Sequence, residues 1–164
     1  MTPLRLAIAL AAAATVSPAA AQIANHGIAL ETGISSPLGT SGGAAATFAA
    51  SASAWIDGDL EGFARIAFSS ADGTRDRAAV PALAGTVGLR LSLGRAAVRP
   101  QLFAEGGWAR VEAERGSSSR AAFGVGGALE LFPVLDLSVS ARAALRVTGG
   151  APSLEAVVGL GAYF

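Results

Sequence analysis

The sequence predicts an all-β protein, an eight-stranded antiparallel up-and-down transmembrane β-barrel. Apolar and polar residues alternate with a period of two in eight successive segments. Beyond residue 21, no stretch is apolar over the roughly 18 residues that a membrane helix needs. The chain also ends on an apolar, alternating segment, from Val157 to Phe164. Strands with one apolar face can cross a bilayer only when they close into a barrel.

The first 21 residues have the features of an export signal. Arg5 precedes an apolar run from Leu6 to Val16, and three alanines from Ala19 to Ala21 form a small-residue cleavage site. The run is too short to span a bilayer as a helix, although an uncleaved anchor is the alternative. We therefore expect residues 1–21 to be a signal peptide used for Sec export. Residues 22–164 are expected to form a barrel in the outer membrane of a Gram-negative cell.

The clearest predicted strand is 135–147, where every odd position is apolar and the even positions are mostly polar. Weaker alternation predicts seven more strands of a length that suits a tilted membrane strand. The eight segments are 25–33, 45–56, 60–68, 82–93, 97–111, 120–132, 135–147 and 153–164. The alanine-rich stretch 44–54 could also form a helix, but scattered glycines disfavour helices elsewhere.

The predicted connections alternate between short and long, which is the pattern of an up-and-down meander. Tight turns are expected at 57–59, 94–96 and 133–134, and longer connections at 34–44, 69–81, 112–119 and 148–152. With eight strands, both ends of the barrel domain then lie on the side of the tight turns. In outer-membrane barrels this is the periplasmic side. Pro100 cannot donate a ladder hydrogen bond, so we expect a bulge or a break there.

Aromatic residues indicate which face meets lipid, because a soluble barrel alternates in the same way but turns its apolar face inward. Four rings have the parity of the apolar face and lie near predicted long connections: Phe48, Phe68, Trp108 and Phe123. Rings gathered at one level form an interfacial girdle. Three residues are expected at the opposite edge: Ile56, Leu135 and Phe164.

Charged residues share the polar face. They are six acids and five arginines: Glu31, Glu61, Arg65, Arg90, Arg99, Glu105, Glu130, Asp136, Arg142, Arg146 and Glu155. On a soluble protein they would form a solvated surface, but inside a narrow barrel they must be paired. We expect three pairs across neighbouring strands: Arg146 with Glu155, Arg99 with Glu130, and Glu61 with Arg90. The long side chains oppose small residues on alternate strands, which predicts a plugged lumen.

The final segment resembles the assembly signal of bacterial outer-membrane proteins. Gly159 takes the place of its glycine, Ala162 a following apolar place and Phe164 the last aromatic, while Val157 stands where a polar residue is usual. With the export signal and the strand pattern, the mature chain is similar to small outer-membrane barrels of the OmpA and OmpX type. This resemblance implies outer-membrane lipid and lipopolysaccharide as surroundings. It also implies periplasmic chaperones and the barrel-assembly machinery as transient partners.

The composition offers little for catalysis. Twelve basic and twelve acidic residues balance, which disfavours nucleic acid as a partner, and the absence of cysteine excludes disulfides and thiolate sites. The single histidine, His26, has no nearby serine with which to form a nucleophile pair. We expect a non-enzymatic monomer without metal or cofactor that serves envelope structure or surface interaction. A narrow porin-like channel for small solutes and a secreted soluble ligand-binding barrel are the alternatives.

Overall fold

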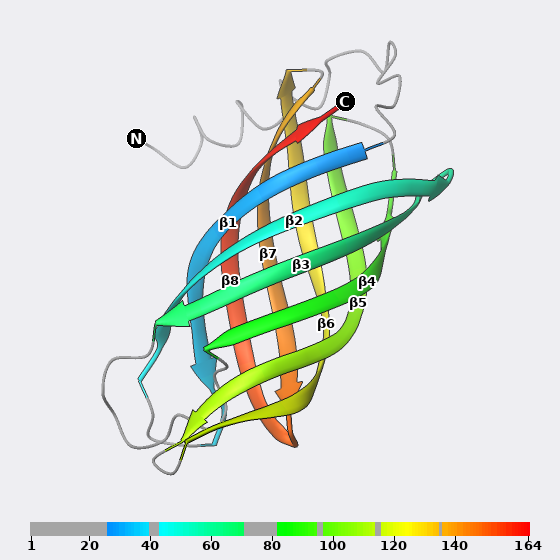
Figure 1. Ribbon diagram of the computed structural model, residues 1–164. Coiled ribbons are helices and arrows are strands. Elements are labelled where there is room, and N and C mark those ends of the chain that lie inside the picture. Colours follow the sequence, from blue (N-terminus) through cyan, green and yellow to red (C-terminus); the bar gives the residue numbers. More distant parts are fainter. Residues whose placement is uncertain (1–25, 40–42, 71–81, 95–96, 114–115, 135) are drawn as a thin grey trace, which may run out of the picture.

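The computed structural model describes residues 26–39, 43–70, 82–94, 97–113, 116–134 and 136–164, which form a closed antiparallel barrel of eight strands in sequence order (Figure 1). The strands are β1 (His26–Pro37), β2 (Ala45–Asp57), β3 (Leu60–Ser70), β4 (Leu83–Ser92), β5 (Val98–Ala113), β6 (Gly116–Val134), β7 (Leu137–Thr148) and β8 (Ala151–Tyr163). The predicted export signal lies outside the described residues. Within them, no helix is long and apolar enough to span a bilayer.

The barrel closes between its first and last strands. β1 and β8 pair from Gly27 and Tyr163 to Pro37 and Ser153. Just outside this ladder, the backbone amides of His26 and Phe164 each donate to the other residue's carbonyl, at 3.2 and 2.9 Å. Closure leaves the sheet without the unpaired edge of an open sheet. β1 begins and β8 ends at the same end of the barrel, which we call the terminal end; the opposite end is the loop end (Figure 1).

All eight predicted strands are confirmed, with differences at their ends. β1 continues to Pro37 instead of ending at residue 33, and β6 begins at Gly116 instead of residue 120. The alanine-rich stretch that could have been a helix is strand β2. Its alanines alternate between the interior and the outer face, so period-two patterning outweighs their helix propensity.

Two of the predicted long connections are wrong. β5 and β6 pair as far as Ala113 and Gly116, and β7 and β8 pair as far as Thr148 and Ala151. Gly149 and Gly150 make the second turn with positive φ angles of 56° and 90°, which glycine adopts without strain. Glycine, serine and charge indicate that the chain turns, but they do not show how far the flanking strands extend.

One expectation near the terminal end is also wrong, and the break expected at Pro100 occurs only toward β4, whose ladder with β5 ends at Gln101. A tight turn was expected at residues 133–134, but these residues belong to the end of β6. The pairing of β6 with β7 shifts register there, between Leu131 and Val134. No register shift occurs at Pro100, which lies opposite Leu129. The Pro100 carbonyl accepts from the Leu93 amide at 2.8 Å. The N–H and C=O of a residue in an antiparallel strand face the same neighbouring strand. The side of Pro100 that lacks an N–H donor therefore faces Leu93, just beyond the end of β4.

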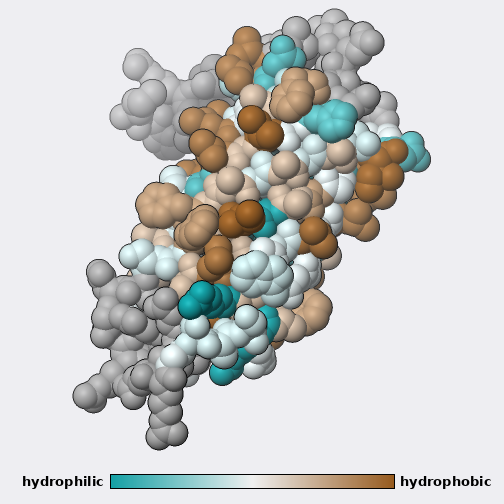
Figure 2. Space-filling view, in the orientation of Figure 1, coloured by the Kyte–Doolittle hydropathy of each residue, from teal (hydrophilic) through white to brown (hydrophobic). Residues whose placement is uncertain are grey.

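The two faces of the barrel wall have opposite character. On β7, the side chains of Leu137, Val139 and Leu145 are exposed, whereas Arg142 and Arg146 are only 6% and 4% exposed. Figure 2 shows the outside as largely brown and pale, with few teal side chains between its ends. Asp136 is an exception to the predicted inward set, because it lies exposed in the turn before β7. An apolar outside around a charged inside is the arrangement expected in lipid, and the reverse of a soluble barrel.

Candidate functional site: the charged interior

Six charged side chains in the middle of the barrel form a closed cycle of ion pairs, which we call the charge ring. Arg65 contacts Glu31 at 2.7 Å and Glu155 at 3.0 Å. Arg146 contacts Glu155 at 3.1 Å and Glu105 at 2.5 Å. Arg142 completes the cycle by contacting Glu105 at 2.8 Å and Glu31 at 3.9 Å.

Acids and arginines alternate around the charge ring, so each group contacts two groups of opposite sign. Taking a charge out of water costs several kcal/mol, and this cost is offset only where partners are close and numerous. Arginine suits this arrangement because its planar fork can meet two carboxylates at once. Several of these guanidinium and carboxylate atoms meet at ion-pair distance without hydrogen-bond alignment. Thr86 adds a hydrogen bond to Glu105 at 3.0 Å.

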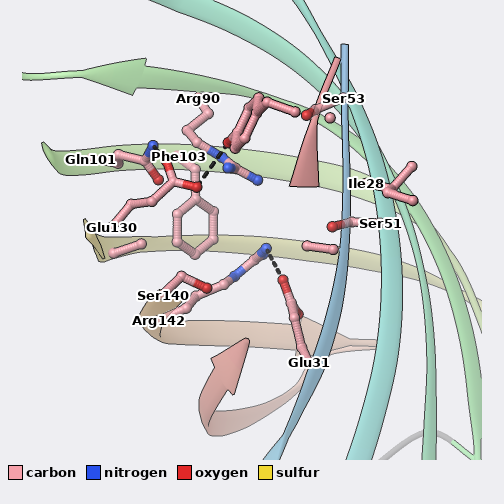
Figure 3. Close-up of a pocket in the computed structure, with 14 residues that line it drawn as sticks. Ile28, Glu31, Ser51, Ser53, Arg90, Gln101, Phe103, Glu130, Ser140 and Arg142 are labelled. Carbon is pink, nitrogen blue, oxygen red and sulfur yellow. Dashed lines mark hydrogen bonds and ion pairs between the residues drawn. The ribbon is translucent and has the colours of Figure 1, made fainter. Parts of the chain in front are cut away.

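An aromatic layer lies next to the charge ring on its terminal side. Phe63 and Phe103 meet edge to face, with ring centroids 6.3 Å apart. The Arg142 guanidinium lies 3.8 Å from the centroid of Phe103, and Figure 3 shows its side chain turned toward Glu31 below that ring. Gly126 provides the space for Phe103, since a Cβ there would lie 2.6 Å from the ring. The predicted opposition of long and small inward residues is therefore visible at this layer.

The remaining four predicted interior charges lie closer to the terminal end. Arg90 contacts Glu61 at 3.4 Å, in the register expected for β3 and β4. Glu130 accepts hydrogen bonds from Gln101 and Tyr163, both at 2.8 Å. Arg99 lies opposite Glu130 in the ladder, as expected, and its guanidinium stacks 4.2 Å from the centroid of Phe132. We call these residues the terminal-end cluster: Glu61, Arg90, Arg99, Gln101, Glu130, Phe132 and Tyr163.

The sequence predicts all six members of the charge ring as interior charges, but it does not predict all of their contacts or every member of the terminal-end cluster. Arg146 and Glu155 do make contact, but Arg146 lies opposite Ser153, because the short turn at 149–150 shifts the register by two residues. Tyr163 is not among the predicted interior residues, although its parity with Glu155 on β8 places it on the inward face. The contacts of Arg65 with Glu155 and of Arg146 with Glu105 join strands that are not neighbours. They can be found only once the barrel is closed.

The space between these layers is small. A cavity of about 20 Å³ lies beside Ser51, Ser53 and Gln101 (Figure 3). This is room for about one water molecule. On the loop side of the charge ring, Ala84, Ala109 and Ala122 pack together as an apolar cluster. Charged, aromatic and alanine side chains thus lie at successive levels of the described interior.

The predicted interfacial aromatics lie on the outer face. Phe48, Phe68, Trp108 and Phe123 are each about half exposed or more, and Phe48 lies opposite Phe68 across β2 and β3. Phe164 is at the terminal end, where its ring stacks on His26 with centroids 6.3 Å apart. Ile56 is exposed on the outside, while Leu135 lies outside the described residues. Both ends of the apolar face therefore carry exposed rings.

Gly159 of the predicted assembly signal also has a role in packing. A Cβ at this inward position would lie 2.8 Å from Ser140 Oγ and 3.2 Å from Glu31 Cγ, so glycine leaves room for a member of the charge ring. Ala162 lies opposite Ile28 and Leu137. Among the described side chains, no three histidine, aspartate or glutamate residues are grouped so that they could hold a metal ion.

Comparison with known proteins places the fold. No known family and no curated protein matches the sequence. Neisserial surface protein A (NspA) is similar with a TM-score of 0.64 at 14% identity, over 85% of this chain and 96% of that one. The N-terminal β-barrel domain of Pseudomonas aeruginosa OprF gives 0.62 at 12%, over 84% and 97%. Ail, the attachment invasion locus protein of Yersinia pestis, gives 0.50 at 13%, over 85% and 96%.

These three proteins are small eight-stranded outer-membrane barrels, and the chain resembles them over most of its length. The predicted fold class is therefore confirmed. At this level of identity, the likeness concerns the fold alone.

Proposed function

We propose that this protein is a non-enzymatic outer-membrane β-barrel with a plugged interior, which serves envelope structure or surface interaction. The observation that carries the proposal is the closed charge ring inside an apolar outer wall. A wall of this kind is stable in lipid, and a ring of six interlocked charges holds the strands together from within. The charged interior does not provide the apolar pocket that a soluble ligand-binding barrel would need.

A closed interior is favoured over a channel. The side chains of Arg65, Glu105 and Arg146 are at most 5% exposed, and the aromatic layer lies directly beside them. An ion crossing this level would have to separate paired charges in a low-dielectric environment, which costs several kcal/mol for each charge left unpaired. The narrow porin-like channel remains the competing function that an experiment must test.

Placement in the envelope forms part of the proposal. The terminal end faces the periplasm and the loop end faces outward, as in other barrels with an even number of strands. Export uses the Sec pathway, and the segment with Gly159, Ala162 and Phe164 is presented to periplasmic chaperones and the barrel-assembly machinery. The folded protein is a monomer surrounded by outer-membrane lipid and lipopolysaccharide. It needs no cofactor.

Surface interaction is supported by the hairpin of β5 and β6. The last β6 residue that pairs with β7 is Ala122, so Gly116 to Ala121 extend beyond that ladder at the loop end. All six of these residues are exposed. A protruding hairpin places backbone and hydroxyl groups where another surface molecule can reach them.

The test combines two measurements on the purified, folded protein. Electrophoresis of unheated and boiled samples should show two mobilities, because a folded barrel resists detergent until it is boiled. Planar-bilayer recordings should show no steady single-channel current above that of protein-free bilayers. A reproducible conductance that scales with the amount of inserted protein would support the narrow channel and overturn the plugged interior.

A further inference from the structure

The ladder between β1 and β8, which we call the closing seam, carries charge of one sign on its inward face (Figure 1). Glu31 on β1 and Glu155 on β8 both point inward, and their side chains are 6% and 4% exposed. In the ladder they lie opposite Gly159 and Ser35, so they do not face each other. Neither strand contains an arginine or a lysine. Two buried carboxylates therefore need cations that the seam strands do not supply.

The inward face of the closing seam also has little side-chain packing of its own. Glycine occupies four of its inward positions: Gly27, Gly33, Gly159 and Gly161. A glycine has no side chain to pack against a cross-strand neighbour, and such pairs normally support a ladder. β1 and β8 are also the strands farthest apart in the chain, so bringing them together costs more loop-closure entropy than forming a hairpin. Contacts from other strands are therefore important for keeping this ladder closed.

Arg65 of β3 supplies a cation to both strands of the closing seam. Its Nε donates to Glu31 Oε2 at 2.7 Å, and its Nη2 lies 3.0 Å from Glu155 Oε1. The Arg65 side chain is itself fully buried. Both nitrogens belong to one planar guanidinium, so the two carboxylates are held in a fixed relation to each other. If β8 moved away from β1, Arg65 would stay with Glu31, because β2 joins β3 to β1, and its contact with Glu155 would break.

The charge ring crosses the closing seam at one other contact. Arg142 of β7 lies 3.9 Å from Glu31, and Figure 3 shows the two side chains turned toward each other. Coulomb attraction falls with distance, so the contact of Arg65 with β8 at 3.0 Å is the stronger of the two. The ring contacts of Glu105 and Arg146 join β5, β7 and β8, which stay linked through β6 when the seam opens. They do not oppose separation of β1 from β8.

We propose that Arg65 is a latch that keeps the closing seam shut, by holding one carboxylate from each of the two strands that meet there. It engages only in the closed barrel, because β8 must lie beside β1 before one guanidinium can reach both acids. Without it, β1 and β8 separate locally while the other ladders stay paired. An open seam exposes two unpaired strand edges, which are costly in lipid. This role goes beyond a plugged interior, since ion pairs within hairpins would fill the lumen without spanning the seam.

The test is amide hydrogen exchange, followed by NMR on the folded protein in lipid nanodiscs. His26 and Phe164 bond to each other through both backbone groups, so even-numbered β1 residues face β8 and odd-numbered ones face β2. The measured quantity is the exchange rate of the Leu30 amide relative to that of the Ala29 amide. Opening of the seam exposes the Leu30 amide and leaves Ala29 paired with β2. Overall unfolding exposes both amides alike, so it leaves this ratio near one.

Arg65→Met should raise the ratio at least about tenfold over wild type, because both seam carboxylates lose the guanidinium. Arg65→Lys keeps the charge but loses the planar fork that reaches both acids, and should raise the ratio at least about threefold. The lysine variant decides the question if the methionine variant does not fold. Glu105→Gln is the matched control, because it breaks the charge ring between β5 and β7 and leaves both contacts of Arg65 intact. It should keep the ratio within about twofold of wild type.

A wild-type ratio in the folded Arg65 variants would overturn the latch. An equal rise in Glu105→Gln would also overturn it, because that variant leaves Arg65 in contact with both seam strands. Equal acceleration at Leu30 and Ala29 would show that Arg65 supports the whole barrel and not the closing seam. Heat-dependent mobility and bilayer conductance are measured on the same samples. A wild-type ratio without conductance contradicts the latch alone, whereas steady conductance of the wild-type protein contradicts the plugged interior alone.

Discussion

Replacing Glu105 by glutamine tests the charge ring most sharply. The Glu105 side chain is fully buried and contacts Arg142 at 2.8 Å and Arg146 at 2.5 Å. Glutamine has the same shape, so the substitution removes the charge without opening a cavity. Removing one partner of a buried ion pair costs about 3–5 kcal/mol. Arg146 keeps Glu155, and Arg142 keeps a contact with Glu31 and the face of Phe103. We therefore expect a loss near the lower limit, about 3 kcal/mol.

A second substitution should recover part of this loss. Combining Glu105→Gln with Arg142→Met leaves a neutral, alternating chain of Glu31, Arg65, Glu155 and Arg146. The methionine can pack against Phe103, where the guanidinium was. We expect the double variant to regain about 1–2 kcal/mol relative to Glu105→Gln alone. Asp57→Asn, at an exposed acid at the end of β2, is the control and should change stability by less than about 0.5 kcal/mol.

The assay is urea unfolding of the protein in detergent or lipid vesicles, followed by the fluorescence of Trp55 and Trp108 and by the loss of heat-dependent mobility. Linear extrapolation gives the free energy of unfolding of each variant. The reasoning is refuted if Glu105→Gln unfolds at the same urea concentration as Asp57→Asn. It is also refuted if the double variant is less stable than Glu105→Gln alone.

Three further predictions concern the charge ring and the layers next to it. Gly126→Ala forces a methyl group against the backbone carbonyl of Ala143 and the ring of Phe103 and should cost about 1–3 kcal/mol in urea unfolding. Gly127→Ala, on the outer face, should have little effect, and equal effects of the two substitutions would contradict the close packing at Gly126. Tyr163→Phe removes a hydrogen bond to the buried Glu130 and should lower the free energy of unfolding by about 1–3 kcal/mol. Unchanged stability would contradict a stabilising role for this hydrogen bond. Arg65→Met breaks two ion pairs of the charge ring, with Glu31 and Glu155, and should lower the free energy of unfolding by about 3–5 kcal/mol in the same assay. A midpoint urea concentration equal to that of the wild-type protein would contradict the stabilising role of the charge ring.

The strands could be predicted from the sequence because alternation is a local property. A residue such as Leu145 or Arg142 faces outward or inward according to its parity, whatever the neighbouring strand does. Register between neighbours was predicted correctly for Glu61 and Arg90, although a long connection joins β3 and β4. The predicted register was wrong by two residues at Arg146, because the true turn at Gly149 and Gly150 is shorter than the connection predicted at 148–152.

The charge ring itself could not be predicted. Its cross-lumen contacts, such as Arg65 with Glu155, depend on how far the sheet is sheared when it closes, and no local pattern records that quantity. Neighbours on the outer face were also beyond reach, because they are separated in sequence. Only the complete register brings Ala50 next to Ile66 and Gly85 next to Trp108.

The most direct test of the whole account is the orientation of β7 in a bilayer. The chain contains no cysteine, so single-cysteine variants can carry one spin label each. We predict that labels at Val139, Ala141 and Ala143 collide readily with oxygen dissolved in the lipid, and that labels at Ser140 and Ala144 do not. Loss of this period of two, or its inversion with Ser140 and Ala144 in lipid, would contradict an apolar wall around a charged interior.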